Sequence, residues 1–382
     1  INQTLSQKRI SRGEKLVIPL AEVNREMADQ VGSKMANLGE IKNRIKVTVP
    51  EGFVVTSLAY EKFLDHNDLQ SEIDRLLQSL SMERMDELYL LSTRLQQLVI
   101  QAEVPEDLQR AMTAAYGEIA PDPSARVSLR SSALGEDSTG TSFAGQYRSE
   151  LNISWENIFQ VYKEIVASKY SPPALTYRLA RGIRDEDIAM CVGCMTMVEA
   201  SAGGVIYSRN PMNIRDDTIR IHAAYGLPKS VVDGSVDADL FIVSRDAPMK
   251  IVDKKIGKKD RIFLCDPEEG VCRLEVTAHE SIVPSISEDQ VFALAVMAVE
   301  LDDYYGSPQD IEWAIKTDGT ICLLQCRPLE QIDSGERTLR VEEEVSKAEQ
   351  VIIRGGTTAS SGVSCGPVFH LVKSADTLRF PR

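Results

Sequence analysis

Residues 309–328 read QDIEWAIKTDGTICLLQCRP, two alternating segments around a polar turn that contains glycine. This pattern predicts a β-hairpin. Alternation places Asp310 and Glu312 on one face of the first strand. It places Gln325 and Arg327 on one face of the second. If the two faces coincide, the oxygen ligands suit Mg²⁺, and the guanidinium suits a phosphate that Mg²⁺ also holds. A hairpin face that carries only salt bridges is an equally good interpretation of these residues.

A long loop of small and hydroxylated residues follows another predicted strand. Residues 127–130 (VSLR) alternate like a strand that ends at Arg130, and residues 131–146 are rich in Ser, Thr and Gly. Arginine beside such a loop suits phosphate binding, because it adds a fork of donors to the N–H and O–H groups of the loop. The alternative is a mobile surface loop. Residues 31–34 (VGSK) precede a helical pattern and offer N–H groups and Lys34 to an anion, although such a turn is common.

The composition is that of an ordinary globular protein. The chain has 382 residues, 43% of them hydrophobic and 26% charged, which is enough for two or three domains or subdomains. Its formal net charge of −14 disfavours a general nucleic-acid scaffold. No apolar run approaches the ~18 residues that span a bilayer, and we recognise no signal peptide. We therefore expect neither nucleic acid nor a membrane among the partners.

The cysteines indicate a reducing compartment. There are seven, an odd number at irregular spacing, so a cytoplasmic location is the simplest expectation. Cys191 and Cys194 form a C-x-x-C within an apolar run. We expect buried, reduced thiols in a strand, with a redox or zinc site as the alternative.

Other segments predict a mixture of helices and strands. Helical periodicity covers residues 58–118, 155–182 and 287–305, and the last begins with a capping sequence at Ser287. Buried or alternating strands are predicted at 149–153, 188–199 and 219–224, and a hairpin at 240–254. Residues 203–211 predict a turn at the glycine pair, then a short strand and a stop.

Several of these blocks together resemble one family. VSLRSSA (127–133) with SFAGQ (142–146), GVIYSRNP (204–211), and DIEWA (310–314) with QCRP (325–328) resemble motifs of the phosphoenolpyruvate synthase and pyruvate phosphate dikinase family. VGSK (31–34) and PEGF (50–53) fit its N-terminal block. The match covers about residues 25–330, and GVSCGPV (362–368) is similar to the opening of the family's swivelling phosphohistidine domain.

This resemblance implies an α+β, ATP-grasp fold of several subdomains at residues 25–332. An N-terminal extension would occupy residues 1–24, a linker 333–354, and the truncated start of the swivelling domain 355–382. Because the sequence begins with Ile1 and ends inside that last unit, we expect a fragment of a longer chain. The expected partners of the ATP-binding part are the swivelling domain with its phosphorylated histidine and the acceptor-binding domain. Both the histidine and the acceptor-binding domain would lie elsewhere in the full-length chain.

The resemblance also implies an activity: phosphate passes from Mg-ATP to a histidine on the swivelling domain and then to an acceptor, typically pyruvate. Lys34 and Arg130 would bind ATP phosphates, and Arg327 would neutralise the terminal ones. The residues expected to hold Mg²⁺ and phosphate are Glu312 and Gln325, with Asp310 in support. The residues expected over the nucleotide are Gly145 and Ser149, and those expected to border adenine through backbone groups are Met197 and Glu199. Arg130 and Arg327 are the candidate catalytic residues.

Two other functions remain open from the sequence. A phosphotransferase of the same architecture with another acceptor, such as a rifamycin-type antibiotic, would have the same ATP-binding part. A non-catalytic nucleotide-sensing module would have kept the fold without the chemistry. The intact charged set disfavours that module, because unused buried charges cost stability.

Overall fold

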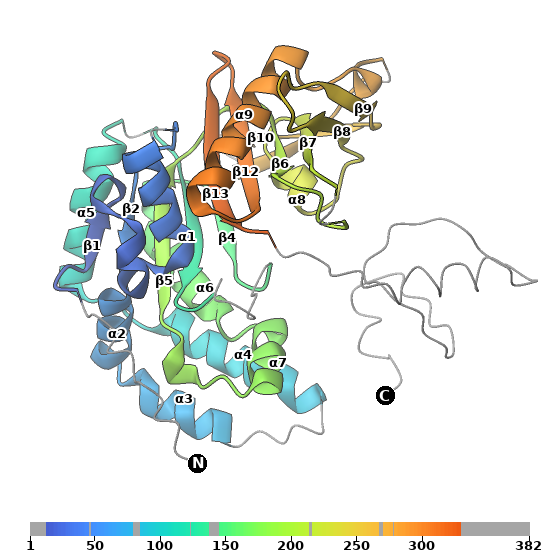
Figure 1. Ribbon diagram of the computed structural model, residues 1–382. Coiled ribbons are helices and arrows are strands. Elements are labelled where there is room, and N and C mark those ends of the chain that lie inside the picture. The colour runs from blue at the N-terminus through green and yellow to red at the C-terminus, as the bar shows by residue number, and fades with distance from the viewer. Residues whose placement is uncertain are drawn as a thin grey trace, which may run out of the picture.

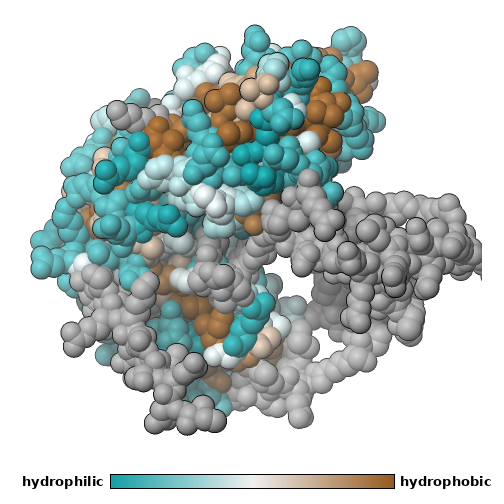
Figure 2. Space-filling view, viewed as in Figure 1, coloured by the Kyte–Doolittle hydropathy of each residue, from teal (hydrophilic) through white to brown (hydrophobic). Residues whose placement is uncertain are grey.

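The computed structural model describes residues 13–45, 47–78, 85–122, 124–136, 145–213, 216–266, 270–277 and 279–329 (Figure 1). The predicted linker and swivelling-domain start, residues 333–382, lie outside this part, as do loop residues 137–144. In the part that is described, no helix is both long and apolar enough to cross a membrane. On the face drawn in Figure 2, hydrophobic residues form patches separated by hydrophilic surface.

The first half of the chain forms a five-stranded antiparallel sheet with order β1-β2-β5-β3-β4. Its strands are β1 Val17–Pro19, β2 Gly52–Val55, β3 Val127–Ala133, β4 Ser149–Ile153 and β5 Met190–Thr196. Strand β1 belongs to the segment that the sequence assigned to an N-terminal extension, and here it is the edge strand beside β2.

Seven helices accompany this sheet among the described residues. They are α1 Ala28–Glu40, α2 Ser57–His66, α3 Leu69–Gln78, α4 Met85–Gln101, α5 Glu106–Ile119, α6 Ile158–Ser168 and α7 Pro172–Arg181. The helical predictions for residues 58–118 and 155–182 are therefore confirmed. Helices α2, α3, α4 and α7 gather at the lower end of the view in Figure 1. Helix α1 contacts β3 and β5 and also reaches β13 of the second sheet.

The second half forms a six-stranded antiparallel sheet with order β13-β12-β6-β7-β8-β9. Its strands are β6 Ala200–Tyr207, β7 Thr218–Tyr225, β8 Asp239–Ser244, β9 Ile251–Lys255, β12 Gln309–Lys316 and β13 Ile321–Pro328. Helix α9 (Glu288–Tyr305) packs on β6, β7, β8 and β12, and the short α8 (Lys229–Val232) follows β7. Helices and antiparallel sheets in this arrangement confirm the α+β class.

The predicted start of α9 has the expected cap. The Gln290 N–H donates to Ser287 Oγ at 3.3 Å, and the Ser287 N–H donates to Gln290 Oε1 at 2.9 Å. This reciprocal pair satisfies two N–H groups that the first turn leaves without partners inside the helix. The capping prediction is therefore confirmed.

Two details of the second half differ from the sequence expectations. Gly203 and Gly204 do not form a turn but lie inside β6, paired with Ala224 and Ala223 of β7. Glycine stands at position 204 because β7 packs too closely for a side chain there. A Cβ on Gly204 would lie 1.9 Å from the His222 carbonyl oxygen. A separate hairpin of β10 (Arg261–Asp266) and β11 (Gly270–Glu275) was missed by the sequence analysis.

The C-x-x-C of the apolar run lies in β5. Cys191 and Cys194 are both buried, and neither is in a disulfide. Burial raises the pKa of both thiols. Such thiols are inert at neutral pH, so the expectation of buried, reduced cysteines in a strand is confirmed.

Candidate functional site

The hairpin of β12 and β13 brings its two polar faces together. The register pairs Glu312 with Gln325 and Asp310 with Arg327, so all four side chains stand on one face of the sheet. Arg327 Nε and Nη2 donate to Asp310 Oδ2 at 2.9 and 2.6 Å. One pair on this face is therefore a salt bridge, and the other places a carboxylate opposite an amide. The predicted Mg²⁺ site on the same face stays a prediction.

Arg130 links the two large sheets. It belongs to β3 in the five-stranded sheet, yet its Nη1 lies 3.1 Å from Glu312 Oε2 and 3.4 Å from the Leu324 carbonyl oxygen in the six-stranded sheet. Only 12% of the Arg130 side chain and 19% of the Glu312 side chain are exposed. The buried Nε of Arg130 has no hydrogen-bond partner among the described residues. A donor left without a partner beside an opposed carboxylate is a feature that a ligand oxygen would satisfy.

Lys34 is held near this junction by a break in α1. Gly32 inside the helix has φ 75° and ψ 158°, and a Cβ there would lie 2.0 Å from the Ser132 carbonyl oxygen of β3. Only glycine fits this contact and this φ. Past the break, the Met35 N–H donates to Ser132 Oγ at 3.2 Å. Since Ser132 shares a face of β3 with Arg130, the restarted helix brings Lys34 to the same side of the sheet.

Lys34 has a buried counterion that the sequence analysis missed. Its Nζ lies 2.6 Å from Glu136 Oε1, with 13% of the lysine and 1% of the glutamate side chain exposed. Glu136 Oε2 accepts from the Ala133 N–H at 3.2 Å, so the carboxylate is fixed to the end of β3. Glu136 lies within the loop of residues 131–146, but nothing in its local sequence marks it as a partner for a lysine about 100 residues earlier.

An apolar pocket lies next to Arg130 between the sheets. Its walls include Met195 and Val198 from the end of β5 and Leu324 from β13, with Ser128 and Arg130 at its polar side. Met197 also lines it, but the Met197 N–H already donates to the Arg126 carbonyl oxygen at 3.0 Å. Glu199 is not among the residues that line this pocket. That backbone groups of Met197 and Glu199 border a base stays a prediction.

Gly145 and Ser149 lie near the end of the long loop. Ser149 pairs with Arg130 in the register of β3 and β4, and it lines a polar pocket along β4. Gly145 has φ 70°, a conformation that favours glycine. Their predicted place over a nucleotide stays a prediction.

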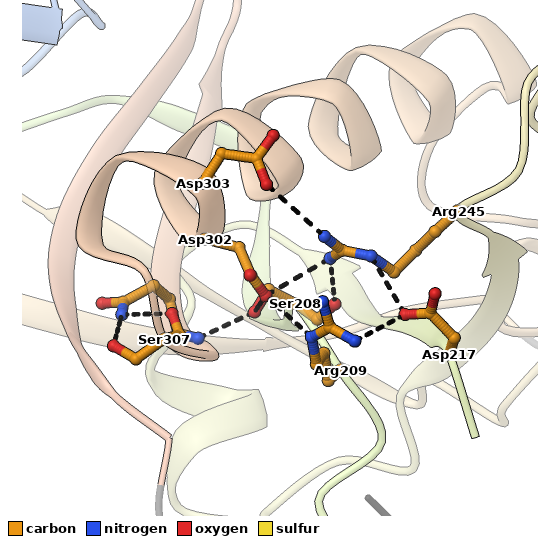
Figure 3. A network of polar contacts seen from close by, with 8 residues as sticks. Ser208, Arg209, Asp217, Arg245, Asp302, Asp303 and Ser307 are labelled. Atoms are coloured by element: carbon orange, nitrogen blue, oxygen red, sulfur yellow. Dashed lines mark hydrogen bonds and ion pairs between the residues drawn. The ribbon is translucent and has the colours of Figure 1, made fainter. Parts of the chain in front are cut away.

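The motif GVIYSRNP has a structural explanation, because its Ser208 and Arg209 enter a buried polar network at the end of β6 (Figure 3). Ser208 Oγ donates to Asp302 Oδ2 of α9 at 2.7 Å and accepts from the Gln309 N–H of β12 at 2.7 Å. Arg245 Nη1 donates to the Ser208 carbonyl oxygen at 2.9 Å and lies 3.3 Å from Asp302. The network therefore fixes the residue that precedes Asp310.

The donor set fits a hard cation. Glu312 and Gln325 face each other across the hairpin, and Asp310 lies two register positions away on the same face. A carboxylate, an amide oxygen and a second carboxylate suit Mg²⁺, which takes few protein ligands and completes its shell with water and phosphate oxygens. The described residues contain no cluster of three or more His, Cys, Asp or Glu side chains that would form a metal cage of their own.

Comparison with known proteins gives a consistent answer. Residues 28–349 match the family model described as pyruvate phosphate dikinase, AMP/ATP-binding domain. A probable phosphoenolpyruvate synthase of Methanocaldococcus jannaschii is 33% identical over 96% of this chain and 31% of its own length. The phosphoenolpyruvate synthase of Neisseria meningitidis is 31% identical over 92% of this chain and 46% of its own. A rifampicin phosphotransferase of Bacillus cereus is 31% identical over 82% and 36%. The chain thus spans less than half the length of each of these relatives.

Proposed function

Because the chain belongs to the family of pyruvate phosphate dikinase AMP/ATP-binding domains, we propose that it is the ATP-binding part of a phosphoenolpyruvate synthase-like phosphotransferase. In this proposal, phosphate passes from Mg-ATP to a histidine on a swivelling domain and then to pyruvate. One observation carries it: Arg130 of one sheet meets Glu312 of the other beside an apolar pocket. A site of this kind can hold a base and a polyphosphate between two sheets, in the manner of an ATP-grasp fold.

The apolar pocket takes the adenine in this proposal. Met195, Val198 and Leu324 supply apolar walls for a purine, and Arg130, which also lines the pocket, would face the phosphates. Lys34 and Arg327 then bind the more distant phosphates, since a guanidinium fork and an ammonium group recognise phosphate oxygens in complementary ways.

In the structure each of these three cations is held by a carboxylate. Lys34 pairs with Glu136, Arg130 with Glu312, and Arg327 with Asp310. A triphosphate brings its own negative charge, so its oxygens take over contacts that the carboxylates make. Glu312 and Gln325, with Asp310 in support, would then be the residues that hold Mg²⁺. The ion would supply positive charge that neutralises the phosphate oxygens.

Arg130 and Arg327 have the catalytic role in this proposal. Phosphoryl transfer is catalysed mainly by positioning and by electrostatic stabilisation of the equatorial oxygens. Arg130 from one sheet and Arg327 from the other would hold the phosphate chain from two sides, with Arg327 at the terminal phosphates and the acceptor histidine approaching from the swivelling domain.

A second acceptor is supported by one observation, the similarity to rifampicin phosphotransferases. Both candidates share the ATP-binding machinery proposed above. They separate only in the acceptor, so pyruvate-dependent and rifampicin-dependent consumption of ATP by a chain that includes the swivelling domain would distinguish them.

The test of the shared part is calorimetric titration of the chain with ATP and Mg²⁺. We expect binding in the wild type and losses of about 10- to 100-fold in Arg130→Ala and Arg327→Ala, because each removes a charge-assisted contact. Arg184→Ala is the matched control, since this exposed arginine pairs with its near neighbours Glu186 and Asp187 away from the site. A flat titration of the wild type, or unchanged affinity in both site variants, would overturn the proposal and favour a module without nucleotide chemistry.

A further inference from the structure

Asn152 in β4 has an unusual backbone conformation, and its side-chain nitrogen donates to two carbonyl oxygens. Its φ is +60°, a conformation that costs most residues about 1–2 kcal/mol and that asparagine tolerates better than others. The side chain is buried, and Nδ2 donates to two backbone carbonyl oxygens, of Asp266 at 2.6 Å and of Gly270 at 2.5 Å. A residue in such a conformation within a strand persists when its contacts hold it there.

Both acceptors belong to the hairpin that the sequence analysis missed. Asp266 is the last residue of β10 and Gly270 the first of β11, and the two are paired in the hairpin register. The middle of β10 contacts the segment after β7, where the Leu227 N–H donates to the Phe263 carbonyl oxygen at 2.9 Å. The hairpin is therefore attached to that segment through β10 and to the five-stranded sheet through Asn152 at its turn end.

One face of this hairpin packs beside the apolar pocket. Phe263, Cys265 and Val271 contact a small apolar cluster that includes Val198, Leu227 and Leu324. Those three cluster residues also line the pocket proposed for adenine, as does Leu151, the neighbour of Asn152. The position of the hairpin thus determines how closely this wall of the pocket is packed.

We propose that Asn152 is a positioning residue that fastens the β10–β11 hairpin against the base end of the nucleotide pocket, so that affinity for the purine part of ATP depends on its side-chain amide. The inference rests on the proposed ATP site and adds a residue that touches neither base nor phosphate. It separates two parts of nucleotide recognition, because the hairpin borders the apolar pocket whereas Lys34 and Arg327 belong to the phosphate end.

Two substitutions isolate the amide from the backbone. Asn152→Gly accepts the positive φ without strain and removes both donors. Asn152→Asp keeps the size and tolerates the same φ, but sets a carboxylate against two carbonyl oxygens. Asn157→Ala is the matched control, because Asn157 lines the same polar pocket along β4 while its amide donates to Ser154 Oγ of its own turn, at 3.1 Å.

The first measurement compares two ligands on the 382-residue chain, Mg-ATP and Mg-tripolyphosphate, which has no base. We expect Asn152→Gly and Asn152→Asp to weaken ATP about tenfold, the loss that one or two neutral hydrogen bonds produce. Tripolyphosphate affinity should stay within about twofold, and Asn157→Ala should change neither. Unchanged ATP affinity in both Asn152 variants, or an equal loss for both ligands, would overturn the proposal.

The second measurement needs no nucleotide. Cys265 faces the apolar cluster, and burial together with Glu199 raises its pKa to about 11, so we expect slow alkylation. Cys272 pairs with Leu264 and stands on the other face of the same hairpin, which makes it an internal control. Mass spectrometry after timed alkylation should show faster labelling of Cys265 in both Asn152 variants, with Cys272 unchanged.

These two measurements distinguish the proposals from each other. If the wild type binds no ATP, the proposed function fails, and the labelling of Cys265 still decides whether Asn152 fastens the hairpin. If ATP binds but labelling of Cys265 is the same in wild type and variants, the fastening is overturned while the ATP site stands.

Discussion

The pair of Lys34 and Glu136 allows a quantitative prediction through a double-mutant cycle. The two partners are unequally buried, with 13% of the lysine but only 1% of the glutamate side chain exposed. Lys34→Met leaves a buried carboxylate without its counterion, which costs about 3–5 kcal/mol of unfolding free energy. Glu136→Gln leaves a lysine that can turn toward water, and the new amide still accepts from the Ala133 N–H, so we expect about 1.5–3 kcal/mol.

The double variant tests whether these costs share one origin. It contains neither charge, so its cost should fall below the sum of the single costs by about 2 kcal/mol. The assay is urea unfolding followed by fluorescence, with unchanged m-values as the condition for comparing midpoints. Lys15→Met serves as control, because its partner Glu22 is about half exposed and such surface pairs contribute little. Additive costs, or a larger cost for Glu136→Gln than for Lys34→Met, would refute the reasoning from burial.

Two further predictions concern stability. Gly204→Ala should lower the free energy of unfolding by about 1–3 kcal/mol, because its Cβ would meet the His222 carbonyl oxygen at 1.9 Å. Gly117→Ala in α5, where a Cβ would have nothing within 4 Å, should raise it by about 0.5–1 kcal/mol. Thermal unfolding checks both, and a Gly204→Ala variant as stable as the wild type would contradict the packing described for β6. Burial lowers the pKa of Lys169 to about 8 although Asp185 lies 3.1 Å away. Because the unfolded chain then binds more protons than the folded one between about pH 8 and 10.5, this lysine makes stability rise with pH there, by at most about 1.4 kcal/mol per pH unit. The stability difference between wild type and Lys169→Met should therefore grow in favour of the wild type from pH 8 to 10 in urea unfolding, and a difference independent of pH would exclude this titration.

Local patterns predicted most of the elements, because the periodicity of an amphipathic helix or strand is written in adjacent residues. The cap at Ser287, the strand at 149–153 and the hairpin at 309–328 are examples in which neighbouring residues contain the whole signal. The glycine pair at 203 and 204 was misread for the same reason. A glycine pair in the sequence indicates a turn, but these glycines are needed because β7 and Trp313 approach the strand closely. Sequence periodicity contains no information on such a tertiary contact.

The candidate site was predictable only in part. Motifs pointed to Arg130, Glu312 and Arg327, yet the contact of Arg130 with Glu312 across two sheets joins residues that are 182 positions apart. Glu136 and Asn152 escaped notice because each acts through a distant partner, a lysine of α1 in one case and the carbonyls of a hairpin in the other. The hydrogen bond from the Met197 N–H to the Arg126 carbonyl oxygen was equally hidden from the sequence, because it joins two segments about 70 residues apart.

The network around Ser208 has a consequence for how the acidic side chains of β12 keep their place. Ile311 and Trp313 point to the buried side of this strand, where residues of α9 form the core, while Asp310 and Glu312 point to the other side. Asp302 of that same helix ties down the strand's first residue through the serine hydroxyl. The positions of the Asp310 and Glu312 carboxylates therefore depend on α9, which packs on the other side of the sheet. A shift of α9 would change the spacing of these charges on the opposite surface.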